Sequence, residues 1–201
     1  MKIFDVLLAQ TLGLALTTTP ALAQPPSANT PLGGPAIAGV CLLSQQDVLA
    51  SAKVGIAANA RLKQIAQSAD AEISAARAPI ESESKALQAQ AASLKPADLQ
   101  ARRQALESRA QALQQLIEQR RREVELTRER ALGQIARDTQ PVLAAVYKAR
   151  SCGLLFNRGA VLGGNLSGDL TSDVVRGLDA RFTTINFDRA TLPQQPASTG
   201  H

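Results

Sequence analysis

The sequence predicts an α+β fold in which a long antiparallel helical hairpin is inserted between the strands of a small β-rich oligomerisation body. Three observations predict it. The first two are an apolar pattern of heptad spacing over the middle of the chain and short apolar runs on either side of that pattern. Composition is the third observation, because the 201 residues include four Phe, one Tyr and no Trp. So few aromatic rings cannot fill the core of a conventional globular domain, where they supply much of the buried area.

Residues 1–23 have the features of a secretory signal peptide. Lys2 precedes an apolar stretch over residues 6–16, and Ala21 and Ala23 supply small side chains before a cleavage site. The alternative, a membrane anchor, needs roughly 20 apolar residues in a spanning helix. We therefore expect cleavage after Ala23 and export to an oxidising compartment.

Two segments then lead into the hairpin. Residues 24–36 are rich in Pro and Gly, which predicts a flexible tether. The apolar run over residues 37–43 is bounded by Pro and Gly before it and by polar residues after it, which predicts a buried strand followed by the start of a helix. Residues 37–46 are accordingly assigned to the oligomerisation body.

The helical hairpin is predicted over residues 47–150. Its apolar residues recur at intervals of three, four or seven, which is the a/d seam of two helices that face each other. Pro96 and Asp98 suit the first turn of a second helix, so the tip is expected near residues 93–98. The seam residues are Leu62, Ile65, Ala69, Ile73, Ala76, Ile80, Leu87 and Leu94, then Leu99, Leu106, Ala110, Leu113, Ile117, Val124, Ala131, Ile135, Val142 and Val146.

Each arm of about 50 residues should be roughly 75 Å long. Arg103, Arg120 and Arg128 fall at seam positions, so the seam is not expected to be dry along its whole length. Pro79 and Pro141 lie within the arms and are expected to introduce kinks or flexible points, since proline removes a helical backbone donor.

Residues 151–187 complete the predicted body. The segments over residues 152–157 and 160–162, with a turn at Arg158 and Gly159, predict a β-hairpin. Thr171 or Ser172 is the expected N-cap of a short helix that ends near Phe182. Residues 188–201 are polar and expected to be a disordered tail.

A body of this size is marginally stable alone, so we expect its strands to associate with those of other subunits. The strand residues assigned to this contact are Val40, Leu42, Leu154, Phe156 and Val161.

The two cysteines allow two interpretations. Cys41 ends the first predicted strand and Cys152 begins the next, so they can reach disulfide distance if these strands are neighbours. Alternatively, both remain reduced and act as small buried hydrophobic residues. Sequence alone leaves both open.

Several functions are excluded by the residue types present. The only histidine is His201, which rules out a histidine-based triad or a histidine-rich metal site. The Gly-rich stretch over residues 159–168 lacks the spacing and the lysine of a phosphate loop, and Glu81 and Glu83 point in different directions on a helix. The sequence therefore predicts no enzyme, no cofactor and no metal. Nucleic-acid binding is also disfavoured despite the basic pI, because the protein is expected to be exported and its basic residues lack aromatic neighbours for stacking.

The order of these segments resembles the OmpH/Skp family of periplasmic chaperones. The resemblance rests on the signal peptide, the strand over residues 37–40, the helical hairpin, the segment over residues 153–162, and Asp169-Leu170-Thr171 before the last helix. It implies a homotrimer whose body is the trimerisation domain and whose three helical tentacles enclose a cavity. It further implies a periplasmic holdase that binds unfolded outer-membrane proteins without ATP and prevents their aggregation in transit.

The charge of the hairpin fits this implied role. Residues 47–150 contain 17 Lys and Arg against 12 Asp and Glu, a net charge of +5. Basic arms attract acidic unfolded chains and, more weakly, anionic lipid head groups. The alternative for each arginine is a solvated helix face with glutamate partners, such as Glu118 with Arg122. The arginines proposed to contact unfolded proteins are Arg102, Arg103, Arg109, Arg120, Arg121 and Arg122.

A structural function is the competing hypothesis. An exported coiled-coil scaffold of the cell envelope would bind one folded partner through the same arms. A chaperone is distinguished from it by suppressing the aggregation of several unrelated unfolded proteins.

Overall fold

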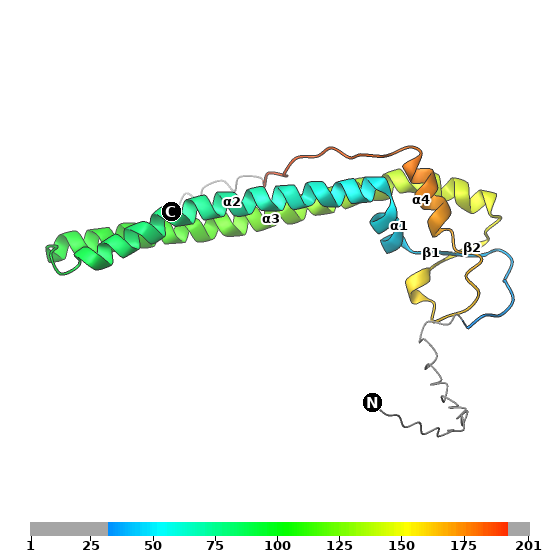
Figure 1. The fold of residues 1–201 in the computed structure, drawn as a ribbon, viewed down its shortest axis with the longest axis horizontal. Coiled ribbons are helices and arrows are strands. Elements are labelled where there is room, and N and C mark those ends of the chain that lie inside the picture. Colours follow the sequence, from blue (N-terminus) through cyan, green and yellow to red (C-terminus); the bar gives the residue numbers. More distant parts are fainter. Residues whose placement is uncertain (1–31, 193–201) are drawn as a thin grey trace, which may run out of the picture.

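The computed structural model describes residues 32–192, which form a long two-helix hairpin with a small body at one end (Figure 1). The predicted signal peptide and residues 24–31 of the predicted tether lie outside the described residues. In chain order the elements are β1 (Val40–Leu43), α1 (Gln45–Ser51), α2 (Lys53–Gln90), α3 (Pro96–Ala149), β2 (Leu154–Asn157), the 3-10 helix η1 (Arg158–Ala160) and α4 (Thr171–Asp179). The expected helical hairpin inserted between short strands is present.

The hairpin consists of α2 and α3, which differ in length. α2 has 38 residues and α3 has 54, or about 57 Å and 81 Å at 1.5 Å per residue. Pro96 occupies the first turn of α3 with Asp98 close behind it, as the sequence predicts for the tip. Pro79 and Pro141 both lie inside helices that continue past them.

The hairpin does not begin as one continuous helix at residue 47. α1 ends at Ser51 and α2 begins at Lys53, because Ala52 between them has an extended backbone with ψ of 141°. Ala52 is fully buried at this corner, where α1 packs against both α2 and α4. The sequence pattern carries no turn residue at this point, and tertiary packing sets the break.

The sheet is smaller than predicted. β1 and β2 are parallel, with register from Val40 opposite Leu154 to Leu43 opposite Asn157. A parallel pair needs a long crossover connection, and the inserted hairpin supplies it. On the other side of β1, Leu42 donates its backbone N–H to Gly168 and accepts one from Leu170, both at 2.9 Å.

The predicted strand over residues 160–162 is wrong. The chain after β2 enters η1 at Arg158 instead of making a hairpin turn, so residues 160–162 do not return along β2, and β2 pairs with β1 instead. Arg158 forms ion pairs with Asp47 and with Asp169, the latter at 2.9 Å, which draws η1 toward α1 and the loop before α4. Val161 consequently lies outside any strand.

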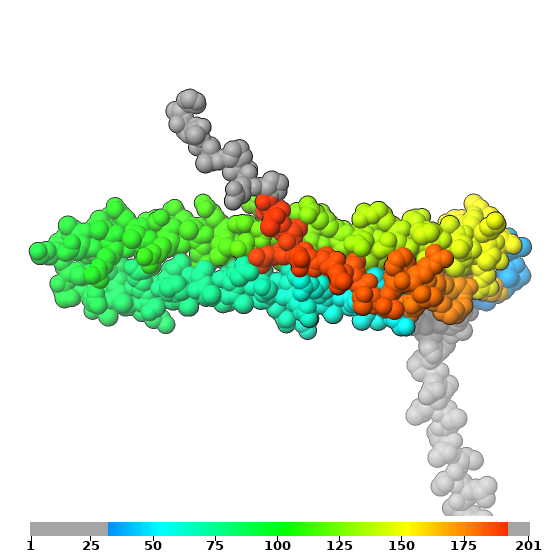
Figure 2. Space-filling model, turned by 90° about the horizontal axis from the view of Figure 1, so that it is seen from above, coloured from blue at the N-terminus to red at the C-terminus, as the bar shows by residue number. Residues whose placement is uncertain are grey.

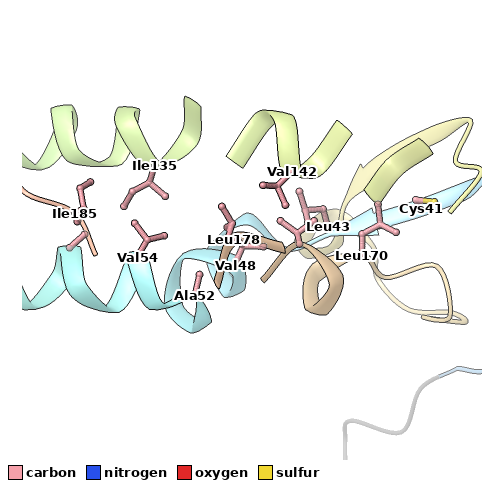
Figure 3. Packing of buried hydrophobic residues seen from close by; sticks show 12 residues of the cluster. Cys41, Leu43, Val48, Ala52, Val54, Ile135, Val142, Leu170, Leu178 and Ile185 are labelled. Carbon is pink, nitrogen blue, oxygen red and sulfur yellow. The ribbon is translucent and has the colours of Figure 1, made fainter. Parts of the chain in front are cut away.

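The core lies where the base of the hairpin meets the body (Figure 3). One face of α4 packs against Val142 of α3 and Val48 of α1. That face carries Val174 and Leu178, with Leu170 just before the helix, and all five side chains are buried. The core residues are Cys41, Leu43, Val48, Ala52, Val54, Ala58, Ile135, Val142, Leu170, Val174, Leu178 and Ile185.

The two cysteines are joined in this structure. The Sγ atoms of Cys41 and Cys152 are bonded, their Cα atoms lie 5.8 Å apart, and the bond closes a loop with a sequence separation of 111. It links β1 to the segment before β2, so both ends of the helical hairpin are fastened at its base.

Residues 180–192, which we call the strap, follow α4 and run back along the hairpin toward its tip (Figure 1). Seen from above, the strap crosses the boundary between α2 and α3 (Figure 2). The disordered tail expected from residue 188 therefore does not begin there, because Arg189 forms ion pairs with both arms and Ala190 is buried.

Candidate functional site

The first candidate surface is the apolar edge strand β2. All four of its residues are exposed, including Leu154 at 57% and Phe156 at 48%. An exposed apolar strand with a free edge can pair with another chain. Of the other predicted contact residues, Val40 is half-buried in β1, Leu42 is buried, and Val161 is half-buried outside the sheet.

The second candidate surface is formed by the arginines of the arms. Four of the six predicted residues have partners. Arg109 pairs with Glu83, Arg121 pairs with Glu118 at 3.4 Å, and Arg102 donates to Gln90 at 3.0 Å. The fourth, Arg120, pairs with two glutamates. The predicted pair of Glu118 with Arg122 is replaced by Glu118 with Arg121, three residues apart.

These arginines do not converge on one pocket. Arg102, Arg103, Arg109, Arg121 and Arg122 are exposed at separate positions along α3, whereas Arg120 turns inward between the arms. The structure thus spreads basic groups along the arm and separates Arg120 from the set.

A shallow apolar hollow interrupts the charged surface near Pro79. It has a volume of about 370 Å³, and its lining combines small and aliphatic side chains from both arms with one guanidinium. The lining residues are Ala76, Pro79, Ile80, Arg109, Ala112, Leu113 and Leu116. It offers an apolar contact beside a positive charge.

A third feature, absent from the sequence prediction, is an ion network between the arms and the strap. Arg120 of α3 donates to Glu72 of α2 at 2.6 Å and to Glu123 at 2.9 Å. Arg189 of the strap binds the same two carboxylates, Glu72 at 2.8 Å and Glu123 at 3.3 Å. Glu123 is almost fully buried, and the two guanidiniums are its ion-pair partners.

The pKa of the Glu72 carboxyl lies below its usual range. The hydrogen bond from Arg189 is the largest cause, followed by the one from Arg120, and burial opposes them only in part. Each guanidinium favours the ionised carboxylate. The strap is thus held to α2 by a group that stays charged.

The strap is also bound through its main chain. Ala190 donates its backbone N–H to Thr127 Oγ1 at 2.8 Å, and Arg61 Nε donates to the carbonyl oxygen of Phe187 at 3.1 Å. Thr127 Oγ1 in turn donates to the Glu123 carbonyl oxygen at 2.5 Å. The only sequence signal for this site is Arg120 at a seam position, where a buried cation requires an acidic partner.

Within residues 32–192 no group of three or more His, Cys, Asp and Glu side chains is arranged to hold a metal ion. None of the helices described over that range is long and apolar enough to cross a membrane.

Known proteins share this architecture. The family model described as "Outer membrane protein (OmpH-like)" matches residues 39–178, from the turn before β1 to the end of α4. The chain belongs to the OmpH-like family. No curated protein matches the sequence.

A crystal structure of another OmpH-like protein has the same fold. It is a candidate outer membrane chaperone from Caulobacter crescentus, 38% identical to this chain. The match has a TM-score of 0.75 and covers 81% of this chain and 96% of that one. The OmpH-like match by the family model ends at residue 178, so the strap lies beyond it.

Proposed function

We propose that this OmpH-like protein is an ATP-independent periplasmic holdase, which binds unfolded outer-membrane proteins between helical arms and prevents their aggregation. Membership of a family that includes a candidate outer membrane chaperone with 38% identity is the observation that carries the proposal. The signal-peptide features of residues 1–23 support export, and the Cys41–Cys152 bond suits an oxidising compartment.

The arms suit weak, distributed binding of an unfolded chain. Their net charge of +5 attracts acidic segments, and the hollow around Pro79 accepts an apolar side chain beside Arg109. Each contact is small and exposed, so a bound chain can be released without an energy source. Outer-membrane proteins expose apolar strand segments when unfolded, and these need to be kept from pairing edge to edge.

The working form proposed is a homotrimer assembled through the body. The exposed apolar side chains and free edge of β2 support association at this end of the molecule. Arms that project from three such bodies would surround a shared cavity. Contact with anionic lipid is proposed as a secondary property of the same basic arms.

Light scattering tests the proposed function directly. A denatured outer-membrane protein is diluted from urea with and without the mature chain, residues 24–201, and the experiment is repeated with two unrelated outer-membrane proteins. Suppression of scattering for all of them at stoichiometric trimer, without ATP, is the expected result. Persistent aggregation at excess trimer would overturn the proposal and leave the scaffold hypothesis.

A further inference from the structure

The groove between α2 and α3 holds the strap through contacts with its main chain as well as its side chains. Two of its contacts involve the strap's main chain, the Ala190 N–H on Thr127 and the Phe187 carbonyl oxygen on Arg61. Main-chain hydrogen bonds of this kind do not depend on the side chains of the bound segment. The Thr127 hydroxyl also donates to the Glu123 carbonyl oxygen of its own helix at 2.5 Å, and this bond orients the acceptor without help from the strap.

The side chains of the strap alternate between the groove and solvent. Ile185 is buried beside Val54 and Ile135 (Figure 3), Phe187 is partly buried, and Arg189 reaches the two glutamates. The intervening residues Asn186 and Asp188 are exposed, although Asp188 pairs with Arg61 of α2 at 2.9 Å. Over residues 185–189 the alternation has the period of two of an extended strand, so the groove contacts mainly one face of this stretch.

The charge of the groove determines which side chain can take the place of Arg189. With the strap in place, Glu72 and Glu123 face two guanidiniums, Arg120 and Arg189. Without Arg189, two carboxylates face Arg120 alone, which leaves a net negative site in an otherwise basic arm. Any segment that replaces the strap must therefore bring a lysine or arginine.

The ion pair between the strap and α2 is weak enough for another segment to replace the strap. Glu72 and Arg189 remain partly exposed, at 37% and 25% of their side-chain surface, and partly exposed ion pairs stabilise weakly. The tether to α4 gives the strap an effective concentration of the order of millimolar. A single free peptide competes poorly with it, whereas a long unfolded chain with many suitable segments competes well.

We propose that this groove is a binding site for extended peptide segments with the pattern apolar-x-apolar-x-Arg/Lys, and that the strap occupies it until such a segment displaces it. The inference rests on the proposed function in one respect, that the displacing segment belongs to an unfolded outer-membrane protein. The strap thereby acts as an internal competitor that keeps the apolar groove covered in the resting protein.

A peptide-binding experiment tests the groove in the full mature chain. The strap is loosened by the double substitution Ile185→Ser with Arg189→Ala, and the matched control carries Arg181→Ala with Asn186→Ser at exposed strap positions. A fluorescein-labelled peptide of residues 183–192 is titrated against each chain and followed by anisotropy. We expect the loosened chain to bind it at least tenfold more tightly than wild type or control.

The specificity of the groove is checked with a second peptide that carries Arg189→Ala. It should lose at least tenfold in affinity for the loosened chain, and equal affinity for both peptides would overturn the charge requirement. Equal binding of the first peptide to wild-type and loosened chains would overturn the site itself. Circular dichroism at 222 nm confirms beforehand that the loosened chain keeps its helices.

Displacement is measured in the wild-type chain, where no substitution can disturb folding. Hydrogen exchange of residues 185–192 is followed by mass spectrometry with fragmentation, which resolves the hydrogen-bonded Ala190 amide, before and after addition of a denatured outer-membrane protein. Exchange should rise at least fivefold in this segment while α4 is unchanged. If wild type suppresses aggregation but the segment stays protected, displacement is wrong and the proposed function stands. If the labelled peptide binds but no chain suppresses aggregation, the groove stands and the proposed function is wrong.

Discussion

Arg189 and Glu72, 117 positions apart in sequence, form a two-pronged ion pair with Nη1–Oε1 at 2.8 Å and Nη2–Oε2 at 3.2 Å. The pair fastens the strap to α2, and Arg120 ties the same carboxylate to α3. One carboxylate thus joins three segments of the chain at a point about halfway along α2.

Acid should release the strap through Glu72. The pKa of this carboxyl is lowered below its ordinary value of 4.5 by Arg189 and Arg120. A lowered folded-state pKa means that the stabilisation is complete above the ordinary value and is lost as the pH falls through the folded-state pKa. The ¹⁵N-resolved amide signal of Ala190 should therefore stay constant from pH 7 to 5 and shift below pH 4.5.

The control for this titration is Glu72→Gln, which keeps the shape of the side chain. Glu123 still faces Arg120 and Arg189 in this variant, so the network is reduced but not removed. The Ala190 shift below pH 4.5 should be much smaller than in wild type. An identical acid step in both chains would mean that another group controls the strap.

Thr127→Val should loosen the strap without disturbing α3. The hydroxyl of Thr127 is buried and accepts the N–H of Ala190, and valine leaves that donor without a partner at a cost of about 1 to 3 kcal/mol. Hydrogen exchange of the Ala190 amide should rise by tenfold or more. Thr139→Val is the matched control, since Thr139 makes the same bond to its own helix at Ile135 but none to the strap. Equal exchange in both variants would contradict the role of Thr127.

Prediction from sequence succeeded where a pattern is local and repeated. The heptad spacing and Pro96 place the two helices and their turn, because both features act within one or two helical turns. The parallel direction of the two strands and the hydrogen bonds of Gly168 and Leu170 to β1 depend on pairing across more than 100 residues. No local signal encodes that choice.

The order of the strap is a second feature that no local sequence pattern predicts. The sequence predicts a disordered tail from residue 188, whereas Arg189 and Ala190 are held by Glu72, Glu123 and Thr127, which are far away in sequence. Arg120 at a seam position pointed to a polar stretch between the arms. It could not show that Arg189 would share both of its carboxylates.

Loss of the disulfide should destabilise the base of the hairpin. A bond that closes a loop of this length contributes about 4 to 5 kcal/mol in the chain-entropy model. Cys41→Ser with Cys152→Ser should lower the urea midpoint accordingly, and the wild-type mass should rise by two hydrogens on reduction. Two free thiols in the non-reduced mature protein would contradict the bond seen here.

Phe156→Ser should weaken the proposed trimer. Phe156 is exposed on the edge strand β2, so its burial by a neighbouring subunit would contribute about 1.5 to 3 kcal/mol per contact. Sedimentation velocity should show smaller species at micromolar concentration. Leu162→Ser removes an even more exposed apolar side chain outside the sheet and serves as the control. A trimer that is equally stable in both variants would place the interface elsewhere.

The same substitution, glycine to alanine, should have opposite effects at two helical positions. Gly55 packs against the end of α1, where an added Cβ would overlap the Leu49 carbonyl oxygen, so the backbones of α1 and α2 have to separate. Gly55→Ala should cost about 1 to 3 kcal/mol, as overpacking of a tight contact does.

Gly133 lies in α3 with only the flexible end of Arg137 nearby, at 3.6 Å. Gly133→Ala should stabilise by up to about 1 kcal/mol through helix propensity. Thermal unfolding of both variants beside wild type measures the difference, and a loss of stability at Gly133 as large as that at Gly55 would show that the corner at Ala52 is not the tight point of the fold.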